Sequence, residues 1–418
     1  MNKNIIGGVV TAIDIGTTKI VVVIARLDSY GRTEILGIGH HPSHGLKKGV
    51  IVNIGVTVDS IKAALKEAQA MAGIKVEAAC VGISGGHIQS LNSTGVVAIK
   101  GRDVGQDDID RVIEAAKAVP LAKDQYILHV LPQYFRVDGQ EYILDSLGMY
   151  GVRLEAQVHI ITGAVASAQN IIKACELSGV RVSDVVLEQL ASAAAVLTPA
   201  EQEMGTGILD IGGGTCDFAI YKDGRIRHSK VLPIAGNHFT NDIAVGLQIP
   251  FNKAEELKKL HGSVLRPTMH DLQNCYVDVP LGFDEGIKTI ALSSMVEIIN
   301  FRAEEILDLF LEEINTYRLR ALMPCGLVLT GGGSLLPGMK ELAQEMLDMP
   351  VRVGYPQTFH EDLSYSLPDI LKSPIYSTVY GLLVHASGER GFGEISGNSD
   401  ALFSRVLKRM KSWVYDLF

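Results

Sequence analysis

Two spacings of apolar residues alternate along the chain, one typical of strands and one typical of helices. Residues 20–24 and 77–84 have the short apolar runs of strands. Residues 57–72 place apolar side chains at helical spacing, with lysine and glutamate between them. Residues 164–177 repeat the helical pattern, and residues 185–187 return to the strand pattern. This alternation predicts α/β domains.

One β-rich pattern occurs twice. Each copy has a strand that ends in aspartate, a tight turn with glycine, a second strand, a hairpin turn and a third strand. The three strands are predicted at residues 11–14, 20–24 and 33–39 in the first copy, and at residues 207–210, 216–220 and 225–233 in the second. Two copies of one β-meander predict two similar lobes that face one another.

The two turns have the composition of phosphate-binding loops. Backbone N–H groups in such turns can point at phosphate oxygens, and small residues permit close approach. Two opposed turns could hold a polyphosphate, and their aspartates could hold a hydrated Mg²⁺. Lys19 could approach the phosphates or remain a solvated surface lysine. The candidate residues are Asp14, Gly16, Thr17, Thr18, Lys19, Asp210, Gly212, Gly213, Gly214 and Thr215.

A third glycine cluster follows a short apolar strand at residues 327–330. It consists of Gly331, Gly332, Gly333 and Ser334, and a helix is predicted from Met339. Backbone exposed at such a turn can pack against a nucleoside. No Gly-x-x-x-x-Gly-Lys-Ser/Thr or complete Gly-x-Gly-x-x-Gly motif is present, so P-loop and dinucleotide-binding folds are poorly supported.

Residues 85–162 interrupt the alternation. They contain predicted strands at residues 94–99 and 126–137 and a predicted helix at residues 106–118. We interpret this segment as a small inserted domain. Towards the end of the chain, residues 386–400 are rich in glycine, serine and asparagine, which is typical of a flexible linker.

The last residues, 400–418, predict an amphipathic helix. Apolar side chains recur every three or four residues, and basic side chains flank this stripe. A basic, aromatic-bearing helix after a linker suits an anionic bilayer surface, but it could also pack on its own domain or bind a partner. The membrane-facing candidates are Phe403, Arg405, Val406, Leu407, Lys408, Arg409, Met410, Lys411, Trp413, Val414, Leu417 and Phe418.

Composition narrows the functional classes. The 418 residues are 47% hydrophobic and 20% charged, as in ordinary globular proteins, and the formal net charge is −9. An acidic chain is a poor general binder of nucleic acid, because it has no overall basic field. No apolar run reaches the length of about 20 residues that a spanning helix needs, so we expect any membrane contact to be peripheral.

Two other patterns carry weaker hypotheses. Residues 82–86 match Gly-x-Ser-x-Gly, but a nucleophile elbow needs a helix directly after the serine, and strand and turn are predicted there. His40, His41 and His44 are expected to form an exposed loop rather than a metal site, because no carboxylate or cysteine accompanies them.

Together the glycine turns resemble the actin-like ATPase superfamily, which includes actin, heat-shock chaperones, sugar kinases and MreB. The Asp-Ile-Gly turns resemble its two phosphate motifs, and the triple glycine resembles its adenosine motif. Residues 186–193 and 376–382 resemble its two connecting segments. The expected fold is a two-lobed actin-like (RNase H-like) fold, each lobe a mixed β-sheet flanked by helices, with a small inserted subdomain.

The superfamily resemblance implies roles for individual residues. Asp14 and Asp210 would hold Mg²⁺ through water, and the turns would bind the phosphates of ATP. Glu188 matches the carboxylate that orients the attacking water, although it could simply interact with a helix dipole. Three residues are similar to those of the helix that touches adenine and ribose: Glu255, Lys258 and Lys259.

Within the superfamily, the chain resembles the FtsA family of cell-division proteins over nearly its whole length. Residues 45–54 and 236–244 look like FtsA signatures, and the insertion at about 85–162 coincides with the extra subdomain of that family. The implied division is a first lobe at residues 1–84, 163–204 and 375–387, an inserted subdomain at 85–162, a second lobe at 205–232 and 321–374, an outer subdomain at 233–320, a linker at 388–399 and the terminal helix at 400–418.

The family resemblance implies an adaptor with weak ATP hydrolysis rather than a metabolic enzyme. It would self-assemble into actin-like polymers and anchor FtsZ filaments to the inner membrane at the division site. It would bind the FtsZ C-terminal tail through residues 233–320, bind anionic lipids and recruit later division proteins. The alternatives are a PilM-like pilus-assembly scaffold, which lacks the terminal helix, and a small-molecule kinase of the same superfamily.

Overall fold

The computed structural model divides into two compact units. Among the residues that the structure describes, the first unit contains those of residues 8–89 and 163–388, and the second contains residues 90–162. The residues that the structure describes are 8–27, 33–265, 275–280, 286–358 and 367–388.

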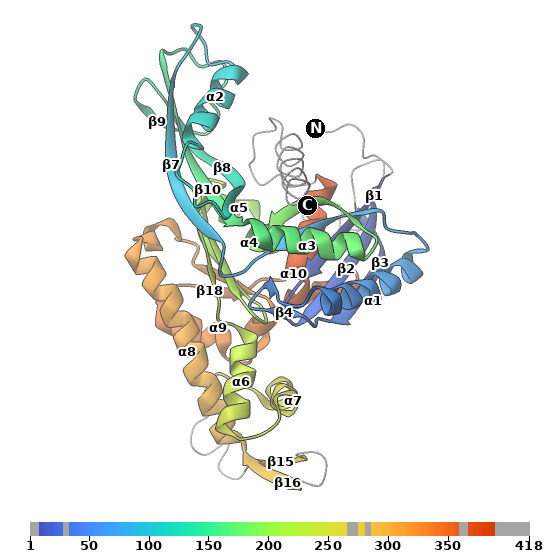
Figure 1. Ribbon diagram of the computed structural model, residues 1–418. Helices are drawn as coiled ribbons and strands as arrows, with labels where there is room; N and C mark the ends of the chain where they lie inside the picture. Colours follow the sequence, from blue (N-terminus) through green and yellow to red (C-terminus); the bar gives the residue numbers. More distant parts are fainter. Residues whose placement is uncertain (1–7, 28–32, 266–274, 281–285, 359–366, 389–418) are drawn as a thin grey trace. The chain divides into compact units, whose positions relative to one another are not determined.

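The first sheet of the larger unit contains the first copy of the β-meander (Figure 1). Its strands, in spatial order, are β11 (Arg181–Leu187), β6 (Ala78–Ile83), β1 (Val9–Ile15), β2 (Lys19–Leu27) and β3 (Thr33–Pro42). Residues 20–25 of β2 have no exposed surface. A strand that is covered on both faces is a continuous apolar run, which is why the pattern of residues 20–24 predicted it.

The second sheet repeats this arrangement. Its strands, in spatial order, are β14 (Arg225–Leu232), β13 (Cys216–Lys222), β12 (Thr206–Ile211), β17 (Leu327–Thr330) and β18 (Val351–Val353). In both sheets an antiparallel meander is extended by two parallel strands that arrive later in the chain. The hairpin turn at Asp223 and Gly224 has φ angles of 55° and 67°, as a two-residue turn with the twist of its strands requires.

Helices pack closely against the first sheet. A Cβ atom on Gly37 or Gly39 of β3 would lie 2.3 Å or 1.9 Å from backbone oxygens of α1, so this approach requires glycine. The helices and short strands of this part are β4 (Leu46–Lys47), β5 (Val50–Ile51), α1 (Ile54–Ala72), α3 (Val165–Leu177), α4 (Glu188–Val196), α5 (Pro199–Met204) and α10 (Ser377–Ser387).

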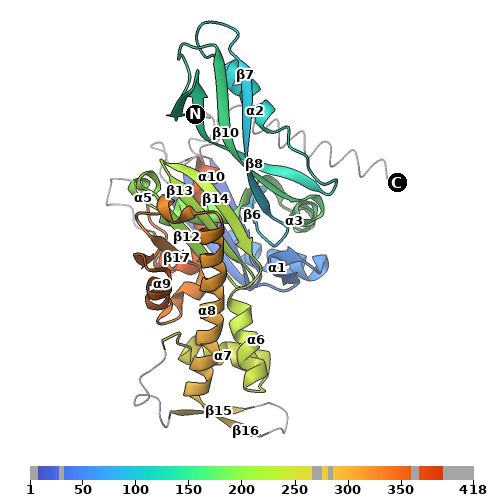
Figure 2. The same ribbon diagram turned by 90° about the vertical axis from the view of Figure 1, so that its left-hand side faces the viewer.

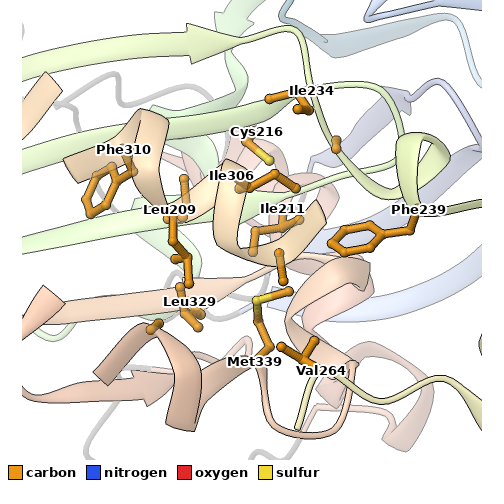
Figure 3. Packing of buried hydrophobic residues seen from close by; sticks show 14 of the residues in the cluster. Leu209, Ile211, Cys216, Ile234, Phe239, Val264, Ile306, Phe310, Leu329 and Met339 are labelled. Atoms are coloured by element: carbon orange, nitrogen blue, oxygen red, sulfur yellow. The ribbon is translucent and has the colours of Figure 1, made fainter. Parts of the chain in front are cut away.

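The core of the second sheet extends into a helical region. Figure 2 shows α8 running along this sheet, past α6 and α7, to the β15–β16 hairpin. In Figure 3, Phe239, Val264 and Met339 gather around Ile211, the last residue of β12. The elements are α6 (Gly236–Gly246), α7 (Phe251–His261), β15 (Tyr276–Pro280), β16 (Ile287–Ala291), α8 (Leu292–Thr316), η1 (Leu319–Leu322), η2 (Gly332–Leu335), α9 (Met339–Leu347), η3 (Asp369–Lys372) and η4 (Pro374–Tyr376).

The second unit is one sheet covered by one helix. Its sheet has the order β7, β10, β8, β9, and its core contains Ile109 and Val112 of the helix against Leu154 and Val158 of β10. The elements are β7 (Gln89–Ala98), α2 (Gln106–Ala116), β8 (Gln125–Val137), β9 (Gln140–Ile143) and β10 (Arg153–Ala164).

The mixed α/β fold predicted from the sequence is confirmed. The predicted helix at residues 106–118 ends at Ala116, two residues early. His40 and His41 are wrongly expected in a loop, because both belong to the end of β3. The predicted terminal helix and all of the linker except Gly388 lie outside the described residues. No described helix is long and apolar enough to cross a membrane.

Candidate nucleotide-binding site

A cavity of about 530 Å³ lies within the first unit, where the duplicated strands β1 and β12 end. Its size is in the range of small-molecule sites. Almost every predicted site residue lines it. They are Asp14, Gly16, Thr17, Thr18, Lys19, Glu188, Asp210, Gly212, Gly213, Gly214, Thr215, Glu255, Lys258, Lys259, Gly331, Gly332 and Gly333.

The two Asp-Ile-Gly turns meet at this cavity. A Cβ atom on Gly213 would lie 2.3 Å from Thr18 Cγ2, and a Cβ atom on Gly214 would lie 2.3 Å from Thr17 Oγ1. The first turn is also held by Gly49, whose N–H group donates a hydrogen bond of 3.0 Å to Thr17 Oγ1. The duplicated turns therefore face one another, and their contact requires glycine in the second turn.

The two duplicated aspartates have different neighbours. Lys19 Nζ lies 3.2 Å from Asp14 Oδ2. Burial alone would lower the pKa of Lys19, but the carboxylates of Asp14 and Asp210 outweigh burial and raise it. Asp210 instead accepts hydrogen bonds from two hydroxyl groups. Burial raises the pKa of Asp210, and these hydroxyl groups oppose that rise.

Glu188 is the first residue of α4, and its side chain lines the cavity. Both interpretations of this residue are therefore compatible with its position. Burial and the charges of Asp14 and Asp217 raise the pKa of Glu188 well above its ordinary value. A buried carboxyl group beside other carboxylates, such as Glu188, is a candidate for proton transfer or for orienting a water molecule.

The predicted ribose-contacting group forms a compact ion cluster on α7. Lys258 Nζ lies 2.6 Å from Glu255 Oε2, and Lys259 Nζ lies 3.2 Å from Glu255 Oε1. Thr240 of α6 donates to the same Glu255 carboxylate. Burial would raise the pKa of Glu255, but Lys258 and Thr240 outweigh burial and lower it.

The triple glycine follows β17, beside Asp210. Gly331 has a φ of 79°, and a Cβ atom there would lie 2.2 Å from Asp210 Oδ1. Ser334 is the one predicted nucleotide-binding residue that does not line the cavity. Its hydroxyl group is buried and donates a hydrogen bond of 2.7 Å to Gly331 O, so it supports the turn from within.

Sequence reasoning missed several residues that line the cavity. Asp217 lies opposite Asp210 on the neighbouring strand β13 and accepts a hydrogen bond from Ser84. Burial raises the pKa of Asp217 to about 7, against the hydrogen bond from Ser84. His40 Nδ1 lies 3.0 Å from the hydroxyl group of Tyr376. A charged residue inside the apolar run of β13 was the available signal for Asp217.

The charge of the cavity tests which ligand would fit. Its lining includes five carboxylates and three lysines, namely Asp14, Glu188, Asp210, Asp217, Glu255, Lys19, Lys258 and Lys259. The lysines can attract a polyphosphate, and the carboxyl groups can attract a divalent cation bound with it. Among the described residues, no group of three or more metal-ligating side chains forms a direct cage. This composition fits a cation that keeps most of its water ligands.

Comparison with known structures identifies the fold. The chain is similar to the PilM–PilN type IV pilus biogenesis complex, with a TM-score of 0.66 and 15% identity over 90% of this chain and 98% of that one. It is also similar to MreB5 of Spiroplasma citri bound to ADP, with a TM-score of 0.52 and 15% identity over 90% of this chain and 95% of that one. The two sheets and the paired turns define an actin-like ATPase fold.

Comparison with known sequences identifies the family. The model described as "Cell division protein FtsA" matches residues 207–381, and that described as "SHS2 domain inserted in FTSA" matches residues 85–162. Cell division protein FtsA of Pseudomonas aeruginosa is 44% identical over 418 residues, covering 99% of both chains. That of Escherichia coli K12 is 34% identical over 414 residues, covering 97% of both. The chain belongs to the FtsA family of cell division proteins.

Proposed function

We propose that the chain binds ATP with Mg²⁺ in the cavity of the first unit. The observation that carries this proposal is the direct contact of the two Asp-led turns, Thr17 and Thr18 against Gly214 and Gly213. Backbone N–H groups of both turns are then available to phosphate oxygens from two sides. The nucleotide-bound MreB5 structures of the same fold support the choice of ligand.

The proposed roles follow the geometry of the lining. Asp14 and Asp210 hold the hydrated metal, and the ion cluster of Glu255, Lys258 and Lys259 faces the sugar. Bound Mg²⁺ supplies charge neutralisation to the phosphates. Glu188 orients a water molecule, and slow hydrolysis follows from positioning and electrostatics rather than from a covalent step.

Equilibrium binding tests the ligand. Titration of the full chain with a fluorescent ATP analogue should saturate, and Mg²⁺ should increase the affinity. Asp14→Asn should reduce that increase. A matched control is Asp59→Asn on the solvent side of α1, a residue that does not line the cavity. Absence of binding by the unmodified chain would reject the proposed ligand.

We further propose that the chain is a self-assembling adaptor at the cytoplasmic face of the inner membrane. Family membership supports a role at the division site, and the amphipathic pattern of residues 400–418 supports attachment to anionic lipids. Residues 233–320 would bind the C-terminal tail of FtsZ, and other division proteins would join the assembled polymer.

Liposome co-sedimentation tests the attachment. The full chain with ATP should pellet with anionic vesicles, and a chain that ends at Gly397 should remain in the supernatant. Leu407→Glu in the full chain should give the same loss, whereas Ser404→Ala, outside the apolar stripe, should not. Equal pelleting of all four proteins would reject the terminal helix as the anchor.

Binding of FtsZ is tested separately. A peptide of the FtsZ C-terminal tail should bind the chain that ends at Gly397, because the proposed site lies within residues 233–320. Phosphoryl transfer to small acceptors should be absent, since a scaffold needs no acceptor pocket. Transfer to a sugar at the rate of a metabolic kinase would contradict the adaptor.

A further inference from the structure

The carboxylate of Asp210 is held by hydroxyl groups of two different helices. Ser192 Oγ of α4 donates a hydrogen bond of 2.5 Å to Asp210 Oδ2. Thr378 Oγ1 of α10 donates one of 3.2 Å to the same oxygen. The two hydroxyl oxygens are 3.1 Å apart, and both residues are at least nine-tenths buried. Both donors therefore act on one oxygen of the carboxylate.

The packing of α4 and α10 explains why these hydroxyl groups converge. A Cβ atom on Gly381 would lie 1.7 Å from Ala191 O, so the two helices touch backbone to backbone there. Ser192 follows Ala191, and Thr378 precedes Gly381 by one helical turn on the same face. The close crossing thus brings one hydroxyl group from each helix to the end of β12.

The other oxygen of Asp210 is confined differently. Asp210 Oδ1 lies against Gly331, where a Cβ atom would be only 2.2 Å away. The carboxylate is consequently fixed on both sides, although its side chain still lines the cavity. The duplicated counterpart Asp14 has an ammonium group at 3.2 Å instead, which compensates its charge. Neutral hydroxyl donors fix Asp210 without compensating its charge.

We propose that Ser192 and Thr378 are positioning residues, which aim the carboxylate of Asp210 at the hydrated Mg²⁺ of the bound nucleotide. This inference rests on the proposed function. Thr378 lines the cavity and Ser192 does not, and the contact that the two hydroxyl groups share is the carboxylate of Asp210. They act by holding the carboxylate in one rotamer with its negative charge available, as outer-shell partners commonly do for metal-binding groups.

The test measures how much Mg²⁺ strengthens ATP binding. The dissociation constant of a fluorescent ATP analogue is determined for the full chain with EDTA and with excess Mg²⁺, and the ratio of the two is the readout. Thr378→Val and Ser192→Ala should each reduce this ratio by about tenfold, the low end for loss of an outer-shell partner. Affinity in EDTA should not change, since the turns are intact.

Two variants separate positioning from a merely structural role. Thr378→Ser keeps the hydroxyl group and should restore the ratio. Ser377→Ala removes the neighbouring buried hydroxyl group, which shares a hydrogen bond of 2.6 Å with Thr330. Ser377→Ala should lower the melting temperature but leave the ratio of the two dissociation constants unchanged.

Each outcome has one meaning. A normal ratio in folded Thr378→Val and Ser192→Ala overturns the inference and leaves the proposed function intact. Equal losses in Thr378→Val and Thr378→Ser, or in Ser377→Ala, overturn it in favour of a packing effect. An unmodified chain whose ATP affinity does not respond to Mg²⁺ overturns the proposed function and the inference together.

Discussion

At the scale of single residues, contact between the two turns depends on the absence of side chains. Gly213 and Gly214 lie directly against the side chains of Thr18 and Thr17. Any larger residue must push one turn away from the other, and both turns line the cavity. A displacement of this kind changes the positions of the N–H groups that are proposed to bind phosphate, without removing any of them.

Gly214→Ala tests this dependence. The added methyl group would lie 2.3 Å from Thr17 Oγ1, so we expect the turns to separate. Affinity for Mg-ATP should fall at least about tenfold, because small misplacements at such sites are costly. The measurement is the binding titration used for the unmodified chain. Gly101→Ala is the control, because a Cβ atom there would lie 3.8 Å from its nearest neighbour. Unchanged binding by Gly214→Ala would contradict the prediction.

Asp217 gives a prediction for the pH dependence of stability. Its folded-state pKa is raised to about 7 from 3.8, chiefly by burial. Between these pH values the folded chain retains a proton that the unfolded chain releases, so stability falls as pH rises towards about 7. Asp217→Asn has no such proton, and its amide oxygen can still accept from Ser84.

Denaturant unfolding at pH 5 and pH 8 measures this effect. The unfolding free energy of Asp217→Asn relative to the unmodified chain should rise between pH 5 and pH 8, by an amount on the order of a few kcal/mol. Glu188 also has a raised pKa, partly because of the charge of Asp217, so the difference between the two proteins includes the change that the substitution causes at Glu188. A difference between the two proteins that is the same at both pH values would rule out a raised pKa at Asp217.

The sequence predicted most of the cavity lining because the turns are duplicated. It assigned no site role to Ser192 and Thr378, although they lie in the segments that resemble the two connecting segments, and it missed Asp217, which lies within an apolar strand. Their placement depends on how α4, α10 and β13 pack, and this is a property of tertiary structure. Ser334 was predicted from its position in a motif, but the side chain turns towards Gly331 O.

At the scale of elements, the crossing of α4 and α10 controls the geometry of the site. The helices meet at Gly381 and Ala191, where a side chain on Gly381 has no room. The spacing of apolar residues predicted whether a segment is a helix or a strand, but it did not predict where each element ends. Helix α2 ends at Ala116 and strand β3 extends to Pro42, because local turns and strand pairing fix the ends.

Gly381→Ala tests the crossing. The methyl group would lie 1.7 Å from Ala191 O and must force the helices apart. Overpacking of this kind costs about 1–3 kcal/mol, which exceeds the gain of up to about 1 kcal/mol in helix propensity. Thermal unfolding should therefore show a lower melting temperature. Gly55→Ala in α1, where the nearest atom to a Cβ is 3.7 Å away, should show no loss.

Gly381→Ala should also weaken the response to Mg²⁺, since Ser192 and Thr378 lie beside the contact. Loss of stability together with an unchanged Mg²⁺ response would mean that the helices separate without moving these hydroxyl groups. The crossing would then stabilise the first unit but would not set the position of Asp210.

At the scale of the whole molecule, duplication and insertion have separate consequences. The two sheets have the same strand arrangement, and the cavity lies where their duplicated turns meet. The second unit has its own sheet and its own apolar core. The duplication could be recognised from sequence, because Asp-led strands and glycine turns recur in one order. How chains would contact one another in the proposed polymer depends on surfaces, which apolar spacing does not reveal.

Separate cores predict that ATP protects one unit and not the other. A ligand at about 100 times its dissociation constant stabilises the form that binds it by about 2.7 kcal/mol. All lining residues belong to the first unit. Amides of β12 and β13 that exchange only when this unit opens should therefore exchange more slowly with Mg-ATP. Amides of α2 in the second unit should exchange at the same rate with and without nucleotide, because that helix packs within a different core.

Hydrogen–deuterium exchange with mass spectrometry measures both regions in one experiment. Asp14→Asn at the same ATP concentration is the control for effects of ATP that do not require binding in the cavity. Slowing confined to the first unit would mean that nucleotide stabilises only the unit that contains the cavity. Equal slowing of α2 would mean that the inserted unit opens together with the lobes, and nucleotide would then stabilise the whole chain as one cooperative body.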